Sequence, residues 1–200
     1  MAESCFRAHV AAGRIQFRLR TDIRNWVMPI VMDTVEPEGA DQLLSVSGGA
    51  LQRSLFFPVY RNDFNTDERE IAVYMDGEKA LGWWHRNVAR AQYSIQGWRR
   101  EKIYPDFIFA MQRDPIGQGG NRLIVLEMKG DYLAGNLDTT YKQALLQLMS
   151  ESYSFEHISR VGELELLADD GTTVECDLVL MSEWKTRLPN QYFSPDQAVD

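Results

Sequence analysis

Cysteine is scarce in this 200-residue chain, which has only Cys5 and Cys176. Two cysteines so far apart in sequence argue against a disulfide framework and cannot build a zinc site. The histidines His9, His85 and His157 show no metal-ligand spacing either. Neither cysteine has a neighbour that indicates nucleophilic catalysis. Zinc and thiol chemistry are therefore not indicated.

Long apolar runs are also missing. No stretch approaches the roughly 20 apolar residues that a membrane-spanning helix needs. Residues 1–7 lack the basic and then apolar layout of a signal peptide, so we expect a cytoplasmic protein with no membrane partner. The chain has no Gly-x-x-x-x-Gly-Lys-Ser/Thr phosphate loop, which excludes an ATPase core of that type.

An excess of basic charge is absent as well, because the formal net charge at pH 7 is −8. This balance weighs against a simple nucleic-acid binder, which usually carries a basic footprint. It does not exclude a nuclease, since acidic residues gather at a catalytic metal and only local basic groups must meet phosphate. A local basic group of this kind occurs at Trp98-Arg99-Arg100-Glu101-Lys102, and Arg86 and Arg90 lie just upstream.

Two short apolar runs, residues 103–110 and 123–130, carry the most informative polar side chains of the chain. A polar loop with three glycines separates them, so we expect the runs to pair as a β-hairpin. Because side chains alternate along a strand, Glu127 and Lys129 project from one side and Met128 from the other. Asp106 can approach the same side. Two carboxylates and an amine that converge in this way predict a site for a hard divalent cation that activates water.

Composition and spacing predict the remaining elements. With 44% apolar and 25% charged residues, the chain is typical of one soluble globular domain, with two small domains as the alternative. Hydrophobic spacing predicts a helix over residues 65–76, started by a capping box from Asn65 to Glu68, and another capped by Asp138 or Thr139. Strands are predicted at residues 14–20, 26–32, 80–84, 93–98, 162–167 and 173–181. The polar tail from Leu188 is expected to be poorly ordered.

Pro105-Asp106 followed by Glu127-Met128-Lys129 resembles the motif of the PD-(D/E)xK nuclease superfamily. Further blocks at residues 64–69, 83–87, 96–100 and 138–142 are similar to the C-terminal endonuclease region of type III restriction enzyme Res subunits and related DEAD/DEAH helicase-nucleases. The resemblance implies an α/β fold, a restriction-endonuclease-like three-layer α/β/α sandwich with a central mixed sheet and an αβββαβ core. It would comprise a nuclease domain at residues 56–187, an N-terminal β-rich extension at 1–55 and a flexible tail at 188–200.

The resemblance also implies a function, that of a Mg²⁺-dependent DNA endonuclease in which Mn²⁺ can substitute. Asp106, Glu127 and the backbone carbonyl of Met128 would hold the ion. Lys129 would orient the attacking water and stabilise charge in the transition state. DNA would be the substrate. A separate helicase or translocase motor and a methyltransferase subunit would be partners, as in the resembling restriction systems.

A helix-borne carboxylate near the metal is a further feature of the superfamily, and Glu68 or Glu70 would supply it here. Glu68 has an equally strong structural interpretation, because the third position of a capping box is where a structural glutamate belongs. The motif residues have plainer interpretations too. Asp106 could be a turn residue, and Glu127 could simply pair with Lys129.

Basic residues outside the motif are candidates for DNA binding, namely Arg86, Arg99, Arg100 and Lys142. A run of surface charge is often only solvated, and Trp98 beside it is better explained as a core residue than as a base-stacking one. Two alternatives to a DNA endonuclease stay open. One is a catalytically silent module of the same fold that binds nucleic acid or docks a protein, and the other is an enzyme acting on RNA or on a modified base.

Overall fold

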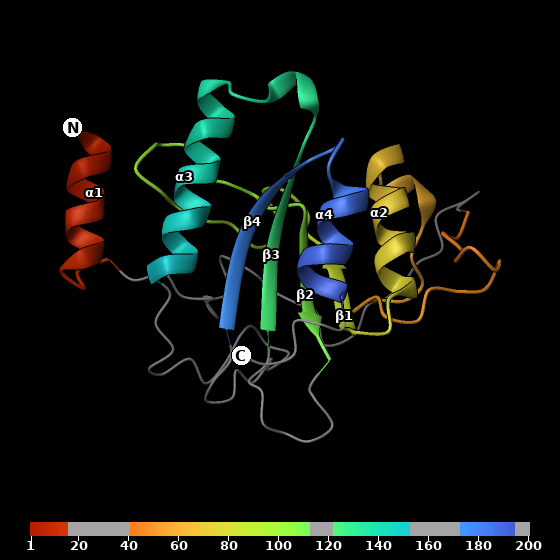
Figure 1. The fold of residues 1–200 in the computed structure, drawn as a ribbon. Helices are drawn as coiled ribbons and strands as arrows, with labels where there is room; N and C mark the ends of the chain where they lie inside the picture. Colours follow the sequence, from red (N-terminus) through yellow and green to blue (C-terminus); the bar gives the residue numbers. More distant parts are fainter. Residues whose placement is uncertain (16–40, 113–121, 153–172, 195–200) are drawn as a thin grey trace.

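A four-stranded mixed sheet lies at the centre of the computed structural model, which describes residues 1–15, 41–112, 122–152 and 173–194 (Figure 1). The strands, in their spatial order, are β1 (Leu81–Arg86), β2 (Phe107–Met111), β3 (Arg122–Lys129) and β4 (Thr173–Leu180). The pairs β1–β2 and β2–β3 are antiparallel, whereas β4 runs parallel to β3. The chain is therefore a mixed α/β protein, as the sequence predicted.

Helices cover both faces of this sheet (Figure 1). One face packs against α3 (Leu137–Ser152), beside which α1 (Ala2–Ala11) lies, and the other packs against α2 (Thr66–Gly77) and α4 (Trp184–Leu188). Because strand side chains alternate, Leu123 and Val125 enter the core on the α3 side, and Ile124 and Leu126 enter the core on the α2 side. A central strand that is buried on both faces needs apolar residues at consecutive positions, which explains the run Leu123–Leu126 in β3.

Helix α2 begins as the sequence predicts. The Asn65 side chain accepts a hydrogen bond from the Glu68 backbone N–H at 2.9 Å, and the Glu68 carboxylate accepts one from the Asn65 N–H at 3.0 Å. This capping box satisfies two N–H groups that the helix itself leaves unpaired. Ile71 and Met75, one turn apart, are fully buried against the sheet, so the predicted apolar stripe is confirmed.

The hairpin between the two motif strands is also confirmed. Phe107 of β2 faces Leu126 of β3, and Ala110 faces Leu123. The N–H of Asp106 extends this pairing by one hydrogen bond, to the Leu126 carbonyl at 2.9 Å. Asp106 is thus held at the entrance of β2, next to the end of β3 where the motif continues.

Two local predictions were wrong. Residues 93–98 form no strand, and only Ile95 pairs, through an isolated bridge to Ile103. The reason is that this segment packs inward on α3, where Gly97 leaves room for the Tyr141 and Leu145 side chains. Helix α3 is capped by Asn136 rather than by Asp138 or Thr139, since the Asn136 Oδ1 accepts the Thr139 N–H at 2.6 Å.

The described part of the N-terminal region differs from the expected β-rich extension. It contains α1, which no prediction anticipated, and isolated bridges such as Leu44–Ala50 instead of full strands. Phe6 and Val10 of α1 pack against the core on the α3 side, which accounts for a helix at this place. The strands predicted at residues 26–32 and 162–167, and nearly all of the one at 14–20, fall outside the described residues.

The beginning of the C-terminal tail differs from the poorly ordered segment expected from Leu188. Residues Pro189–Phe193 form a π-helical turn directly after α4. Tyr192 and Phe193 are buried, and both rings contact Phe109 of β2. Aromatic side chains thus hold this segment in the core in spite of its polar composition. Among the described residues, no helix is long and apolar enough to cross a membrane.

Candidate active site

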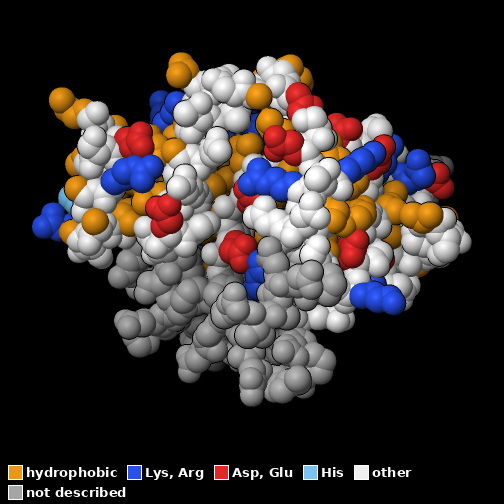
Figure 2. Space-filling model, in the orientation of Figure 1, with side chains coloured by type: hydrophobic (Ala, Val, Ile, Leu, Met, Phe, Trp, Pro, Cys, Tyr) orange, Lys and Arg blue, Asp and Glu red, His pale blue; other side chains and the backbone are white. Residues whose placement is uncertain are grey.

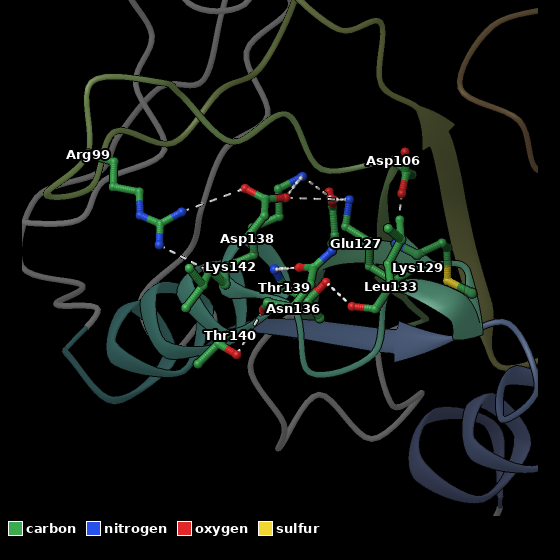
Figure 3. Close-up of polar contacts among 12 residues, drawn as sticks. Arg99, Asp106, Glu127, Lys129, Leu133, Asn136, Asp138, Thr139, Thr140 and Lys142 are labelled. Atoms are coloured by element: carbon green, nitrogen blue, oxygen red, sulfur yellow. Dashed lines mark hydrogen bonds and ion pairs between the residues drawn. The ribbon is translucent and has the colours of Figure 1, made fainter.

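Asp106 lies at the start of β2 with its carboxylate turned toward the end of β3 (Figure 3). Its Oδ2 accepts a hydrogen bond from the Met128 backbone N–H at 2.7 Å. Burial, and then repulsion from Glu127 and Glu68, raise the pKa of Asp106 to about 7, although the Met128 hydrogen bond and Lys129 oppose this change. The fold therefore holds the Asp106 carboxyl group near Glu127, where a second negative charge is unfavourable. A bound cation would favour the ionised form of Asp106 instead.

Glu127 of β3 is the most buried carboxylate of the site, with 3% of the residue exposed. Its Oε1 accepts from the Lys142 ammonium at 2.7 Å and lies 3.2 Å from the Lys129 ammonium. Its Oε2 is buried and has no hydrogen-bond partner among the residues that the structure describes. A buried carboxylate oxygen without a partner is costly, so this atom is where an additional ligand would contribute most.

The two lysines lie between two carboxylates (Figure 3). Besides Glu127 they approach Asp138 of α3, whose Oδ2 is 3.8 Å from the Lys142 nitrogen and 4.0 Å from that of Lys129. Burial alone would lower the pKa of Lys142, but attraction to Glu127 and the hydrogen bond to it outweigh burial, and the pKa is raised. The Lys142 ammonium group therefore stays charged at neutral pH and partly offsets the carboxylates.

The donor set fits a small hard cation. Mg²⁺ is commonly held by one or two carboxylates together with water and substrate oxygens. Asp106 and the partnerless Oε2 of Glu127 provide this minimum. The Met128 side chain packs against the core on the α2 side, as predicted, while its peptide lies at the site. Within the described ranges there is no cluster of three or more His, Cys, Asp or Glu side chains, so a site rich in protein ligands is not available there.

Asn87 holds in place the segment that leads to Asp106. Sequence reasoning included it only as part of the block at residues 83–87. This buried amide donates to the carbonyls of Tyr93 at 2.9 Å and Pro105 at 2.8 Å, and its Oδ1 accepts the Tyr93 N–H at 3.0 Å. The Asn87 backbone N–H also donates to the Asp106 carbonyl at 2.8 Å. One side chain thus joins both ends of the connection between β1 and β2.

Glu68 and Arg86 bind each other beside this centre. The Arg86 guanidinium lies 3.3 Å from Glu68 Oε2 and stacks over the Phe64 ring at 5.6 Å from its centroid. Glu68 also remains engaged in the capping box. The charge of Glu68 reaches Asp106, as the raised pKa of that residue shows, but neither Glu68 nor Arg86 lines the cleft described below.

Arg99 lies apart from the motif carboxylates, and its guanidinium is directed toward the start of α3, 4.0 Å from Asp138 Oδ1 (Figure 3). Its guanidinium donates to the Leu137 carbonyl at 2.9 Å and lies 4.4 Å from the centroid of the Tyr141 ring. Trp98 packs between the Phe6 and Tyr141 rings, as expected for a core residue. Arg99 therefore anchors the β1–β2 connection to α3.

An open cleft of about 650 Å³ lies beside the motif residues. Five basic side chains line it, namely Arg90, Arg100, Lys102, Lys129 and Lys142. Three acidic side chains line it, namely Glu101, Asp106 and Glu127. The cleft is thus locally positive in a chain whose net charge is −8. Of the residues predicted to bind DNA, the structure brings Arg100 and Lys142 to this cleft.

On the face of the molecule that Figure 2 shows, basic and acidic side chains of the described residues are interspersed with apolar ones. Sequence reasoning placed Arg90 near the local basic group and Asp138 at a helix start, but it included neither in the site, although Asp138 and Lys142 have the i, i+4 spacing that pairs charges on a helix. Comparison of the chain with family models, with curated proteins and with solved structures finds no match.

Proposed function

We propose that this chain is a Mg²⁺-dependent DNA endonuclease of the PD-(D/E)xK type, built on a restriction-endonuclease-like core. The element order α2-β1-β2-β3-α3-β4, with β4 parallel to β3, agrees with the αβββαβ order that the resemblance implies. The observation that carries the proposal is the pair formed by Asp106 and Glu127. One is a carboxyl group with its pKa raised to about 7, and the other has a buried oxygen without a partner.

Asp106, Glu127 and the Met128 carbonyl would hold the ion in this proposal. When bound, the cation supplies positive charge and Lewis acidity toward a phosphodiester and a water molecule. The raised pKa of Asp106 supports this assignment. Burial and Glu127 disfavour the ionised carboxylate, and a cation would favour it.

Lys129 and Lys142 would act on the phosphate. Both ammonium groups are near Glu127 Oε1 and line the adjoining cleft. They would be available there to the non-bridging oxygens of a phosphodiester. There they would stabilise the negative charge that develops as water attacks phosphorus and the P–O bond to the leaving oxygen breaks. Lys142 would thus serve in the reaction as well as in DNA binding.

The chain would act as the nuclease component of a restriction or helicase-nuclease system. It has no phosphate loop of the Walker type, so translocation along DNA would come from a separate motor. Sequence recognition would come from a partner such as a methyltransferase subunit.

Nicking of supercoiled plasmid in Mg²⁺ or Mn²⁺ tests the proposal. We expect Asp106→Asn, Glu127→Gln and Lys129→Gln each to lower the cleavage rate by about 100-fold or more, as removal of a single charge-stabilising group commonly does. Glu175→Gln is the matched control. This residue is a half-buried glutamate on β4 whose ion pair with Arg122 lies at the opposite end of the sheet.

Two outcomes would contradict an enzyme centred on these residues. Cleavage that persists in all three variants would place the activity elsewhere or in a contaminant. Absence of cleavage, together with a Mg²⁺-dependent rise in Tm that Glu127→Gln abolishes, would favour a silent metal-binding module of the same fold.

A further inference from the structure

Three of the basic side chains that line the cleft come from one segment. Arg90, Arg100 and Lys102 belong to the connection between β1 and β2 and are exposed. None of the three forms a hydrogen bond or an ion pair in the described part of the chain. Two other cations of the cleft, Lys129 and Lys142, are by contrast both engaged with Glu127.

Arg90 has a backbone conformation that disfavours its own side chain. Its φ of 66° lies in the left-handed region, which glycine and asparagine tolerate best. The turn around it is braced, because the Gln92 N–H donates to the Val88 carbonyl at 3.0 Å and the Gln92 Oε1 accepts the Val88 N–H at 2.8 Å. An exposed arginine at such a position, with no partner among the described residues, indicates a role outside the folding of the turn.

We propose that Arg90, Arg100 and Lys102 bind the backbone phosphates of a polynucleotide on either side of the bond that is cut. The position of that bond, at Asp106 and Glu127, rests on the proposed function. Three cations without a partner among the described residues exceed what a single phosphate group needs, so their ligand is a chain of phosphates and not a mononucleotide. The acidic net charge of the protein repels such a polyanion elsewhere and directs it to these three residues.

The arginines assigned to DNA binding here differ from those predicted by sequence. Arg86 and Arg99 were candidates by sequence, but their guanidinium groups are already engaged with Glu68 and with the Leu137 carbonyl. A phosphate would have to compete with these partners. Arg90 and Lys102 need no such exchange, and Arg100 is the residue on which the two assignments agree.

Metal-free binding measurements separate this proposal from the proposed function. Fluorescence anisotropy of a labelled duplex of about 20 base pairs, in EDTA, would give Kd over a range of salt concentrations. Each of Arg90→Gln, Arg100→Gln and Lys102→Gln is expected to weaken binding about tenfold at about 0.1 M salt and to reduce the slope of log K against log salt by about one. A mononucleotide at the same phosphate concentration should not compete.

Two variants serve as controls. Lys79→Gln removes an exposed lysine before the start of β1, at the far end of that strand from the cleft, and Lys185→Gln removes an exposed lysine of α4 that pairs with Glu70 of α2. Both are expected to bind within about twofold of the wild type. Failure of the wild type to bind, or equal losses in the controls, would overturn the proposal. Binding that depends on the three residues without any cleavage in Mg²⁺ would support it and count against the nuclease.

Arg90→Gly provides an independent readout. Glycine relieves the left-handed strain, so we expect Tm to rise by about 2–4 °C while affinity falls as in Arg90→Gln. A residue that only supports the turn would show the reverse, a lower Tm with unchanged affinity. That result would also overturn the proposal.

Discussion

Asp106 makes the stability of the metal-free protein depend on pH in a direction that can be worked out from the structure. Its pKa of about 7 in the folded state exceeds the ordinary value of 3.8, because burial and repulsion from Glu127 disfavour the charged form. In the unfolded chain the carboxyl group ionises near its ordinary value. Stability from the protonated group is therefore complete below about pH 4 and is lost as pH rises through 7.

The magnitude follows from the two pKa values. The whole difference corresponds to about 4 kcal/mol, of which about 2–3 kcal/mol falls between pH 5 and pH 8. His85 acts in the opposite sense. Burial lowers the pKa of this imidazole to about 4, so its contribution is present above about pH 6.5 and is lost as pH falls toward 4. The wild type alone would thus show a broad profile, and the comparison with Asp106→Asn isolates the carboxyl group.

Urea unfolding in EDTA at a series of pH values is the appropriate assay. Relative to Asp106→Asn, the wild type should lose about 1 M in its urea midpoint between pH 5 and pH 8. Millimolar Mg²⁺ should restore stability at pH 8 more than at pH 5, because the cation competes with the proton for the same oxygens. Parallel profiles for the two proteins, with no effect of Mg²⁺, would refute the placement of Asp106 beside Glu127 in a buried site.

Two further substitutions test how the fold positions the site. Asn87→Ala removes the buried amide that holds Tyr93 and Pro105, so unfolding measurements should show a loss of about 3 kcal/mol and plasmid nicking should slow. Gly97→Ala places a methyl group 2.5 Å from the buried Tyr141 and Leu145 side chains, so thermal unfolding should show a Tm about 5 °C lower. Gly77→Ala, where the added carbon meets nothing within 4 Å, should not lower it.

The parts of the fold that sequence reasoning predicted are those in which a local pattern meets a local physical requirement. The alternation of Glu127, Met128 and Lys129 requires no knowledge of distant residues, and the side of the strand on which each lies was predicted correctly. The capping box at Asn65 and Glu68 is equally local, since its hydrogen bonds join residues three apart.

The parts that were missed depend on contacts between residues far apart in sequence. Arg86 binds Glu68 from a neighbouring element, and Arg99 stacks on Tyr141 of α3, so neither reaches the cleft that its charge suggested. The strand predicted at residues 93–98 was lost to packing on α3 in the same way. A pattern of charges gives the candidates for phosphate binding, but only the partners of each charge decide which ones are available.

Glu127 shows how the same reasoning applies to the candidate site as a whole. Its Oε1 is shared by two lysines while its Oε2 has no partner, so the protein neutralises this buried carboxylate from one side only. A purely structural ion pair would satisfy both oxygens, because each unpaired buried atom costs stability. The asymmetry, together with the raised pKa of Asp106, leaves two carboxyl groups beside the cleft that a cation would stabilise. In a chain of net charge −8, one cleft thus holds both the carboxyl groups that would bind a cation and the basic side chains that would bind a phosphate.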